Sequence, residues 1–190
     1  MKYIYKIERI CSSNIIFYHS LNICPRLSRI LSKCWDSGWK SHNPREHWLD
    51  HDGDILFTER NGNLRIIQDG QLLEKSLLTL GVEGGMLGLT VDPNFEENSF
   101  IYIYYTYNEF LTTTNKLVRF QLTGNALTED KTLLDGIPDG PFHDGGKIQF
   151  RPDEKLYITT GEAANPALAQ DLNSLGGKIL NQFWWDNSRR

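Results

Sequence analysis

The sequence predicts an all-β fold, and three observations support this prediction. Short runs rich in Ile, Leu, Tyr, Phe and Thr are bounded by Gly, Pro, Asn or Asp, as is typical of strands joined by turns. One layout of turn, strand, polar loop and second strand occurs three times after residue 43. In that part of the chain, helical periodicity is confined to a weak pattern at residues 166–175.

Residues 1–43 precede the repeats and differ from them in composition. They hold seven Lys and Arg residues against two acids, which gives a net charge of +5. A secretory signal needs an apolar core of about 7–15 residues, but the apolar stretch 10–24 is interrupted by Ser, Asn and His. All cysteines of the chain lie here, without the close pairs of a zinc site: Cys11, Cys24 and Cys34. We expect residues 1–43 to form an irregular or partly helical extension, and the sequence does not indicate its function.

The strands follow in order from residue 44. They are expected at residues 54–59, 64–67, 87–91, 100–106, 116–122, 147–150, 155–160 and 178–180. Thr58, Thr106 and Thr159 occupy corresponding positions, 48 and 53 residues apart. Asn61-Gly62 predicts a tight hairpin with a type I′ turn, which needs positive φ at both central residues. Further turns are expected at three glycines: Gly70, Gly124 and Gly136.

The repeat length indicates the architecture. Periods of about 40–50 residues built from short strands are typical of β-propeller blades. A closed propeller has about 4–8 blades, so three repeats predict roughly half a ring. Strand faces and edges at the two ends of such an array are open, which predicts self-association. The expected organisation is an extension (1–43), a partial propeller (44–180) and a divergent tail (181–190).

Charge and hydropathy exclude two classes of partner. Residues 44–190 hold 13 basic against 22 acidic side chains, a net charge of −9. A protein that binds a phosphate backbone needs a basic patch to replace counterions, so nucleic acid is not an expected partner. Because no run of 18 or more apolar residues is present, a membrane-spanning helix is not expected either.

Two glycine-rich loops at similar places in neighbouring repeats are the candidate site. They are residues 82–88 and 142–147, and each has a polar side chain before a Gly-Gly pair and then a strand. Paired glycines allow a backbone to approach a flat ligand closely. His143 is the candidate general base because imidazole titrates near neutral pH. Glu83 is the candidate ligand contact; for both residues a merely solvated side chain is the alternative.

The other groups of residues that could form a metal or catalytic site do not have the spacing that such sites need. Asp50, Asp52 and Asp54 alternate as calcium ligands do, but the glycine and glutamate of a calcium loop are misplaced, which favours a turn at the start of a strand. Three histidines lie in one loop with no reason to converge on a metal: His42, His47 and His51. The chain has no Gly-x-Ser-x-Gly elbow for acyl transfer.

Several stretches resemble the glucose/sorbosone dehydrogenase family, in order and spacing. They are Asp52–Arg60 with Gly62–Arg65, Glu83–Leu89 with Asp92–Phe95, His143–Lys147, and Leu156–Gly161 followed by Asn165–Asp171 and Leu175–Leu180. Residues 44–180 are similar to the N-terminal half of these soluble aldose sugar dehydrogenases, which use pyrroloquinoline quinone (PQQ) on a six-bladed propeller. Residues 1–43 have no counterpart, and the chain departs from the pattern after Leu180.

The resemblance implies a function. It makes His143 the base that accepts a proton from the sugar hydroxyl while hydride passes to the quinone, and it places Glu83 at the cofactor. Glu83 stands where the family usually has Gln, and Phe142 stands where the glucose-specific branch has a sugar-binding Asp. Calcium and most PQQ contacts are expected from the C-terminal half. An aldose and an external electron acceptor are the implied partners. Family members are commonly periplasmic or secreted, and the compartment of this chain stays open.

The alternative reading is a propeller fragment without catalytic activity. Such a fragment would act, if at all, as a binding or self-associating module. A propeller lactonase, which uses a channel metal, would need converging carboxylates, and the spacing of Asp92, Asp144 and Asp171 does not predict them.

Overall fold

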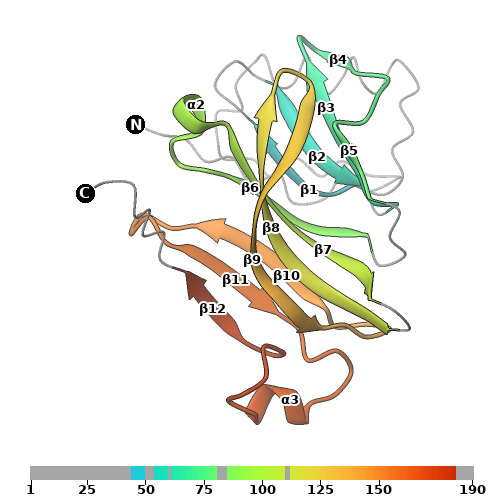
Figure 1. Cartoon of the computed structure of the whole chain (residues 1–190), viewed down its shortest axis with the longest axis vertical. Helices are drawn as coiled ribbons and strands as arrows, with labels where there is room; N and C mark the ends of the chain where they lie inside the picture. Colours follow the sequence, from blue (N-terminus) through green and yellow to red (C-terminus); the bar gives the residue numbers. More distant parts are fainter. Residues whose placement is uncertain (1–43, 50–53, 60, 81–84, 110–111, 183–190) are drawn as a thin grey trace, which may run out of the picture.

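The computed structural model describes residues 44–49, 54–59, 61–80, 85–109 and 112–182 (Figure 1). Nearly all of its regular structure is β-strand, in three antiparallel sheets that follow one another along the chain. The all-β prediction is confirmed. Within the described part, no helix is long and apolar enough to span a membrane.

The first sheet is built around one hairpin. It contains β1 (Pro44–Leu49), β2 (Ile55–Glu59), β3 (Asn63–Gln68) and β4 (Gln71–Leu72) in that order, and β5 (Leu78–Thr79) pairs with β3. The predicted β2–β3 hairpin forms, but its turn is not of type I′. Of its two described loop residues, Gly62 has positive φ (86°) and Asn61 does not, and the Gly62 N–H donates to the Glu59 carbonyl (3.0 Å).

The second sheet is the longest and lies in the middle. It contains β6 (Met86–Val91), β7 (Phe100–Glu109), β8 (Thr112–Thr123) and β9 (Ala126–Pro138), with the short helix α2 (Phe95–Asn98) between β6 and β7. β9 has no counterpart among the predicted strands, because most of its side chains are exposed and it lacks alternating hydrophobicity. Gly136 lies inside β9, where the register with β8 shifts, and not in a turn.

The third sheet contains three strands. They are β10 (Gly145–Phe150), β11 (Leu156–Thr160) and β12 (Ile179–Gln182), in that order. The loop from β11 to β12 carries α3 (Ala167–Gln170), which is shorter than the weak pattern at 166–175 suggested. Thr160, which is 8% exposed, is buried like Thr58 and Thr106, whereas Thr159 is only half-buried.

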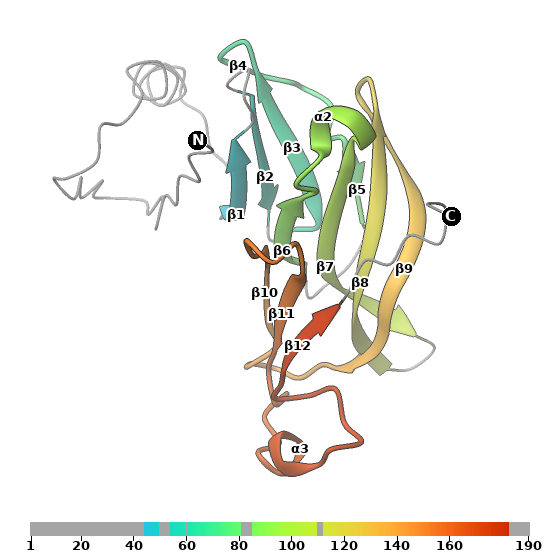
Figure 2. The ribbon, with the colours of Figure 1, turned by 90° about the vertical axis from the view of Figure 1, so that its left-hand side faces the viewer.

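The sheets pack face to face through their first strands. β6 lies against both β1 and β10, so the first strands of the three sheets are neighbours (Figures 1 and 2). β7 is buried on both faces: Ile101 and Ile103 join the core with the first sheet, and Tyr102 and Tyr104 join the core with the third sheet. This is the arrangement of three consecutive propeller blades, as predicted.

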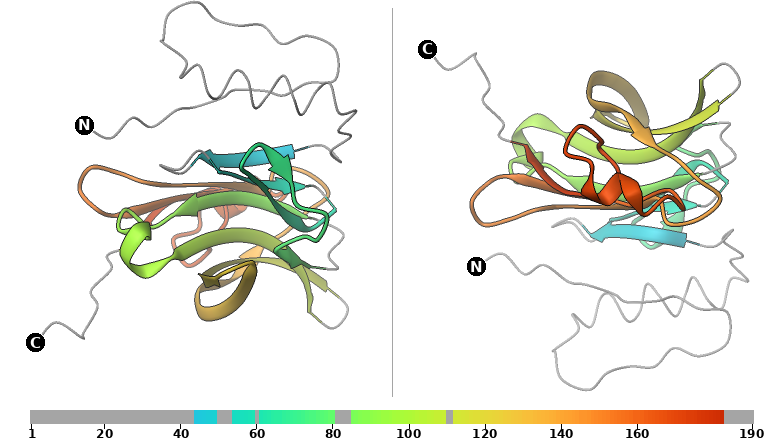
Figure 3. Two further views of the ribbon diagram at one scale, coloured as in Figure 1. Left: turned by 90° about the horizontal axis from the view of Figure 1, so that it is seen from above. Right: turned by 90° about the horizontal axis from the view of Figure 1, so that it is seen from below.

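The outer face of the third sheet exposes mainly polar side chains. Among the described residues, the exposed large hydrophobic side chains are Phe142, Leu172 and Ile179, and only Ile179 lies on a strand. The neighbouring exposed positions of the third sheet are polar, as at Lys147, Gln149 and Asn181. α3 and its loop lie at the same end of the molecule as this sheet (Figure 3).

Candidate functional site

The described ends of the two glycine-rich loops lie together. The N–H of Thr106 on β7 donates to the Gly85 carbonyl (3.2 Å), and its hydroxyl lies 3.5 Å from the Asp139 carboxylate. The Tyr104 hydroxyl donates to the carbonyl of Asp144 (3.4 Å). β7 therefore connects the start of β6 with the segment that leads into β10. Glu83 lies outside the described residues, so its place in this arrangement stays a prediction.

The glycines of the second loop are used for packing. A Cβ at Gly146 would lie 2.7 Å from the Cβ of Leu87, and a Cβ at Gly88 would overlap the Gly146 carbonyl oxygen. A Cβ at Gly145 would lie 2.6 Å from the backbone nitrogen of Gly161. These glycines therefore bring β6, β10 and β11 into close contact.

His143 is held in a left-handed backbone conformation just before β10. Its φ is +65°, which side chains with a Cβ rarely adopt. The His143 carbonyl accepts a hydrogen bond from the Ala163 N–H (3.2 Å), and Gly161 packs so closely that a Cβ there would overlap that carbonyl oxygen. The backbone of His143, which precedes β10, is thus held by residues that follow β11. The His143 side chain remains 60% exposed.

A carboxylate orients the imidazole of His143. Nδ1 of His143 lies 2.6 Å from Oε1 of Glu162, whose side chain is 25% exposed. The hydrogen bond from His143 lowers the pKa of the Glu162 carboxyl, so the carboxylate stays ionised as the acceptor. If Nδ1 carries the proton in this bond, the lone pair on Nε2 is free to accept one. The pair has the geometry of a general base and its orienting acid.

Sequence reasoning missed Glu162, although a signal was present. Gly145 pairs with Thr160 at the end of the β10–β11 ladder. In an antiparallel pair, each step back from one partner matches a step forward from the other, so the same register places residue 143 opposite residue 162. Pairing the predicted strands 147–150 and 155–160 through their tight turn places residue 143 opposite residue 163, and the register shift between Gly145 and Ile148 moves the partner to residue 162, so the sequence locates the contact to within one residue.

Phe142 stands beside this pair. Its side chain is 56% exposed, and its ring meets the His143 imidazole edge to face, with centroids 4.8 Å apart and planes at 77°. An aromatic ring in this geometry packs against the imidazole and restricts its rotation. The exposed surface at this loop therefore combines an apolar ring with an imidazole.

Lys178 organises the loop that carries Glu162. Its Nζ donates to the carbonyls of Leu168 (2.7 Å), Ala169 (3.2 Å) and Gly176 (2.7 Å). Two of these carbonyls belong to α3, so the ammonium group satisfies carbonyls at the end of this helix and ties them to Gly176. The loop between β11 and β12 is thereby held by the residue that directly precedes β12.

The remaining candidate carboxylates serve local structure. Asp92 accepts from the Asn94 N–H (2.9 Å) and the Tyr102 hydroxyl (2.7 Å). Asp144 accepts from the Gly140 N–H (2.9 Å), and Asp171 from the Asn173 N–H (2.9 Å). Within the described ranges, no group of three or more His, Cys, Asp or Glu side chains is placed to hold a metal ion. Asp50, Asp52, His42 and His51 lie outside those ranges, as does the side chain of His47.

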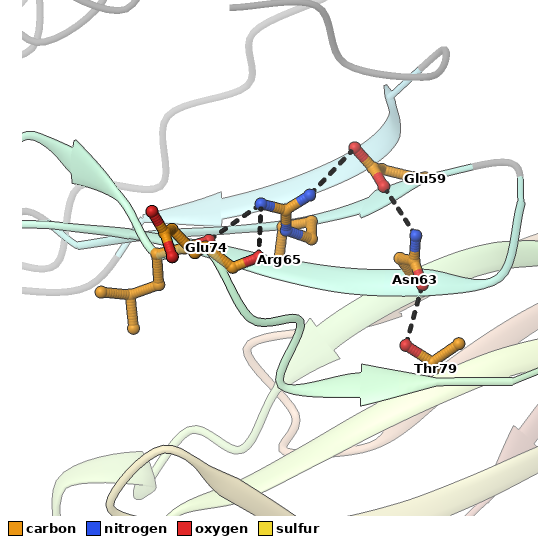
Figure 4. A network of polar contacts seen from close by, with 6 residues as sticks. Glu59, Asn63, Arg65, Glu74 and Thr79 are labelled. Atoms are coloured by element: carbon orange, nitrogen blue, oxygen red, sulfur yellow. Dashed lines mark hydrogen bonds and ion pairs between the residues drawn. The ribbon is translucent and has the colours of Figure 1, made fainter.

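A second polar cluster lies in the first sheet (Figure 4). Glu59 is 2% exposed; it accepts from the Asn63 amide (3.0 Å) and lies 3.8 Å from the Arg65 guanidinium. The Thr79 hydroxyl donates to Asn63 (2.9 Å), and Arg65 donates to the Leu73 carbonyl (2.8 Å). Because these contacts join β2, β3, β5 and the segment between β4 and β5, the cluster fixes the sheet.

Comparison with known proteins gives a consistent match. The profile of the Glucose / Sorbosone dehydrogenase family matches residues 42–182. A solved structure from Thermus thermophilus, assigned as an oxidoreductase (glucose dehydrogenase), is 40% identical with a TM-score of 0.69, over 74% of this chain and 44% of that one. The PQQ-bound aldose sugar dehydrogenase of Streptomyces coelicolor is 30% identical with a TM-score of 0.64, over 75% and 45%.

A curated relative adds a quinoprotein to these matches. Quinoprotein glucose dehydrogenase B of Acinetobacter calcoaceticus is 28% identical over 95 residues, which is 46% of this chain and 20% of that protein. The chain spans less than half the length of each of the relatives named here. The matched range, 42–182, includes all three sheets of the structure.

Proposed function

The chain belongs to the glucose/sorbosone dehydrogenase family, and from this premise we propose that it carries part of the active site of a PQQ-dependent aldose dehydrogenase. In this proposal a sugar hydroxyl is oxidised to a carbonyl, an external electron acceptor completes the cycle, and His143 is the base. The single observation that carries the proposal is the hydrogen bond between His143 and Glu162, in a loop that the family match includes.

The geometry suits a base that takes a proton from an alcohol. Glu162 accepts from Nδ1, which fixes the tautomer and directs Nε2 away from the carboxylate. The negative charge of Glu162 also stabilises the imidazolium that forms when Nε2 accepts the proton. The exposed side of the ring lets a sugar hydroxyl reach Nε2, because 60% of the side chain faces solvent. Each of these steps uses only residues of this chain.

PQQ fits this site in part. When bound, the quinone supplies the acceptor for the hydride that leaves the sugar carbon. The described loops contribute His143, and we assign Glu83, at the start of the neighbouring loop, as a further contact to the cofactor. A carboxylate beside a reduced, anionic quinone would be repelled unless it is protonated or paired with a cation. Calcium would provide such a cation, and the described residues hold no group of three or more His, Cys, Asp or Glu side chains placed to bind it.

The test is a dye-reduction assay. Purified chain, PQQ, calcium chloride, D-glucose and a dye acceptor are mixed, and the initial rate is followed by absorbance. We expect turnover, and His143→Ala lowers it by roughly 10²- to 10⁴-fold because a general base contributes about that much. Lys155→Ala, at the opposite end of the β10–β11 hairpin, is the matched control and keeps the rate.

The rival reading predicts a different result from the same assay. A non-catalytic propeller fragment gives no sugar-dependent dye reduction at any PQQ or calcium concentration. Turnover that persists unchanged in His143→Ala would contradict the role of the base, even if the chain is an oxidoreductase. Turnover that requires His143 supports the proposal.

A further inference from the structure

We infer that Asn115 is a positioning residue, whose buried amide joins the end of β7 to the segment that carries His143. As a statement about turnover the inference rests on the proposed function, whereas the positioning itself is measured without turnover. Asn115 lies on β8, the strand between β7 and β9, and its side chain is 0% exposed. Asparagine is depleted in strands and costly to bury without hydrogen bonds, so its partners show what it is there to hold.

The amide of Asn115 makes two hydrogen bonds of fixed direction. Its Nδ2 donates to the Pro138 carbonyl (3.0 Å), and because that oxygen only accepts, Oδ1 faces the opposite way. Oδ1 accepts from the Thr106 hydroxyl (2.7 Å), which belongs to a side chain that is 1% exposed. A hydroxyl has one proton, so this bond uses it, and the Asp139 carboxylate accepts from Thr113 instead.

The two partners of Asn115 lead to the two candidate loops. The Thr106 N–H donates to the carbonyl of Gly85 (3.2 Å), which directly precedes β6 and is the described end of the first loop. Pro138 ends β9, and four residues separate it from His143 in the second loop. The contacts from Gly85 through Thr106 and Asn115 to Pro138 therefore set the position of the second loop relative to the first.

The segment 139–143 depends on anchors of this kind because its backbone is strained. His143 has φ +65°, a conformation that persists only where the surrounding structure holds it. From the third sheet, the Ala163 N–H donates to the His143 carbonyl (3.2 Å). From the second sheet, Asn115 binds the Pro138 carbonyl at the start of the segment. Without the anchor in the second sheet, the segment relaxes and the bond between Ala163 and His143 opens more often.

Hydrogen exchange of the full chain, followed by NMR, tests the positioning. Thr106→Val removes the hydroxyl at nearly constant volume, whereas Thr106→Ser keeps the hydroxyl and removes a methyl group. We expect the Ala163 amide to exchange at least roughly fivefold faster in Thr106→Val, because the buried Asn115 carbonyl loses its donor, and at close to the wild-type rate in Thr106→Ser. The Leu122 amide, bonded to the Ser99 carbonyl (2.9 Å) near the other end of β8, is the reference for a general loss of stability.

Asn115→Leu is the second variant. It removes both hydrogen bonds of the amide, so we expect a larger increase in the Ala163 exchange rate relative to that of Leu122. Asn63→Leu is the matched control, because this asparagine also binds two polar side chains, but in the first sheet. It lowers the stability of the chain and leaves the ratio of the Ala163 and Leu122 exchange rates unchanged.

The results separate positioning from packing. If Thr106→Ser accelerates Ala163 exchange as much as Thr106→Val does, or if neither changes the ratio to Leu122, the inference is wrong, because Asn115 then serves only the interior of its own sheet. The Thr106 pair decides the question if Asn115→Leu does not fold.

Kinetics separate the inference from the proposed function. In the dye assay, Thr106→Val lowers kcat roughly three- to thirtyfold and leaves KM for glucose within about twofold, because a displaced base slows the chemical step more than binding. Faster Ala163 exchange in Thr106→Val, without turnover even in the wild type, contradicts the proposed function and leaves the positioning intact. Turnover that requires His143, with unchanged exchange and unchanged kcat in Thr106→Val, overturns the inference and leaves the function intact.

Discussion

At the scale of single residues, the candidate site depends on one hydrogen bond and on the backbone that presents it. Glu162 fixes His143, Phe142 borders it, and Gly161 leaves room for the His143 carbonyl. Sequence reasoning found His143 from its place before a Gly-Gly pair. It did not find that these glycines also pack β6 against β10, because that contact cannot be inferred without knowing which strands are neighbours.

The role of Glu162 is tested by Glu162→Gln. The amide keeps the size of the side chain but removes the charge that stabilises the imidazolium, and its NH₂ group can donate to Nδ1, so the side chain no longer fixes one tautomer. We expect kcat in the dye assay to fall at least roughly tenfold, with an unchanged far-ultraviolet circular dichroism spectrum. Glu154→Gln, in the exposed turn at the other end of the β10–β11 hairpin, is the control and keeps kcat. Equal activities would contradict the orienting role.

The same pair predicts a direction of pH dependence. The hydrogen bond from His143 lowers the pKa of Glu162. The contribution of this hydrogen bond to the free energy of unfolding is therefore fully present above the pKa that Glu162 has in the unfolded chain. It is lost as pH falls through the lowered pKa that Glu162 has in the folded chain. In carboxyl ¹³C NMR titrations, His143→Ala raises the midpoint of Glu162 toward that of an ordinary Glu. A midpoint that does not move would show that the bond is absent in solution.

We predict that an alanine substitution lowers the free energy of unfolding more at Gly161 than at Gly124, a glycine with positive φ. A Cβ at Gly161 overlaps the His143 carbonyl oxygen, so Gly161→Ala forces the two segments apart and destabilises the fold by about 3 kcal/mol. Gly124→Ala adds a Cβ in open space at φ +57° and costs about 1 kcal/mol from backbone strain. Urea denaturation measures both, and equal losses would contradict the close packing at His143.

At the scale of elements, the strands that alternate or that are buried on both faces were predictable. β2 and β7 are apolar runs bounded by turn residues, and both lie close to the expected ranges. β9 was not predictable, because its exposed charged side chains leave no hydrophobic pattern and its pairing with β8 is a long-range property. α3 is only four residues long, because it ends at Asp171, an extended residue that begins the next turn.

The polar cluster of the first sheet carries an element-scale prediction. Arg65→Leu leaves the Glu59 carboxylate, only 2% exposed, without its cation, and lowers the free energy of unfolding by roughly 3 kcal/mol. The double variant Glu59→Leu/Arg65→Leu loses less than the sum of the single variants, because no charge is then left unpaired.

Asp130→Asn is the control for the cluster. It breaks the ion pair with Arg119, whose two side chains are 18% and 33% exposed, and costs less than about 1 kcal/mol. Urea denaturation compares the variants. A loss in Arg65→Leu no larger than that in Asp130→Asn would show that the cluster does not stabilise the sheet.

At the scale of the whole molecule, three sheets packed through their first strands form three propeller blades. The repeat of 48 residues between Thr58 and Thr106 predicted this, since strands and turns recurring at that spacing have few other packed solutions. The composition of the open face was not predictable from the repeat. Which strand face meets a neighbouring blade depends on register, and a shift of one residue reverses it.

Self-association is the prediction that belongs to this scale. β12 is the edge strand of the third sheet in the described part of the chain, and Ile179 on it is 78% exposed. An exposed edge with an apolar side chain pairs with other edges. Sedimentation velocity should show concentration-dependent association, which Ile179→Lys reduces and Leu172→Lys, outside the strand, does not. A monodisperse monomer over the accessible concentrations would contradict this.

The central claim is that this family member holds a quinone next to His143, and quinone uptake tests it most directly. The full chain is titrated with PQQ in the presence of calcium, and the absorbance and the fluorescence of the bound cofactor are followed. We predict saturable uptake of about one PQQ per chain, with a shifted spectrum in His143→Ala relative to wild type and an unchanged spectrum in Lys155→Ala. No uptake at any calcium concentration would contradict the claim for this chain.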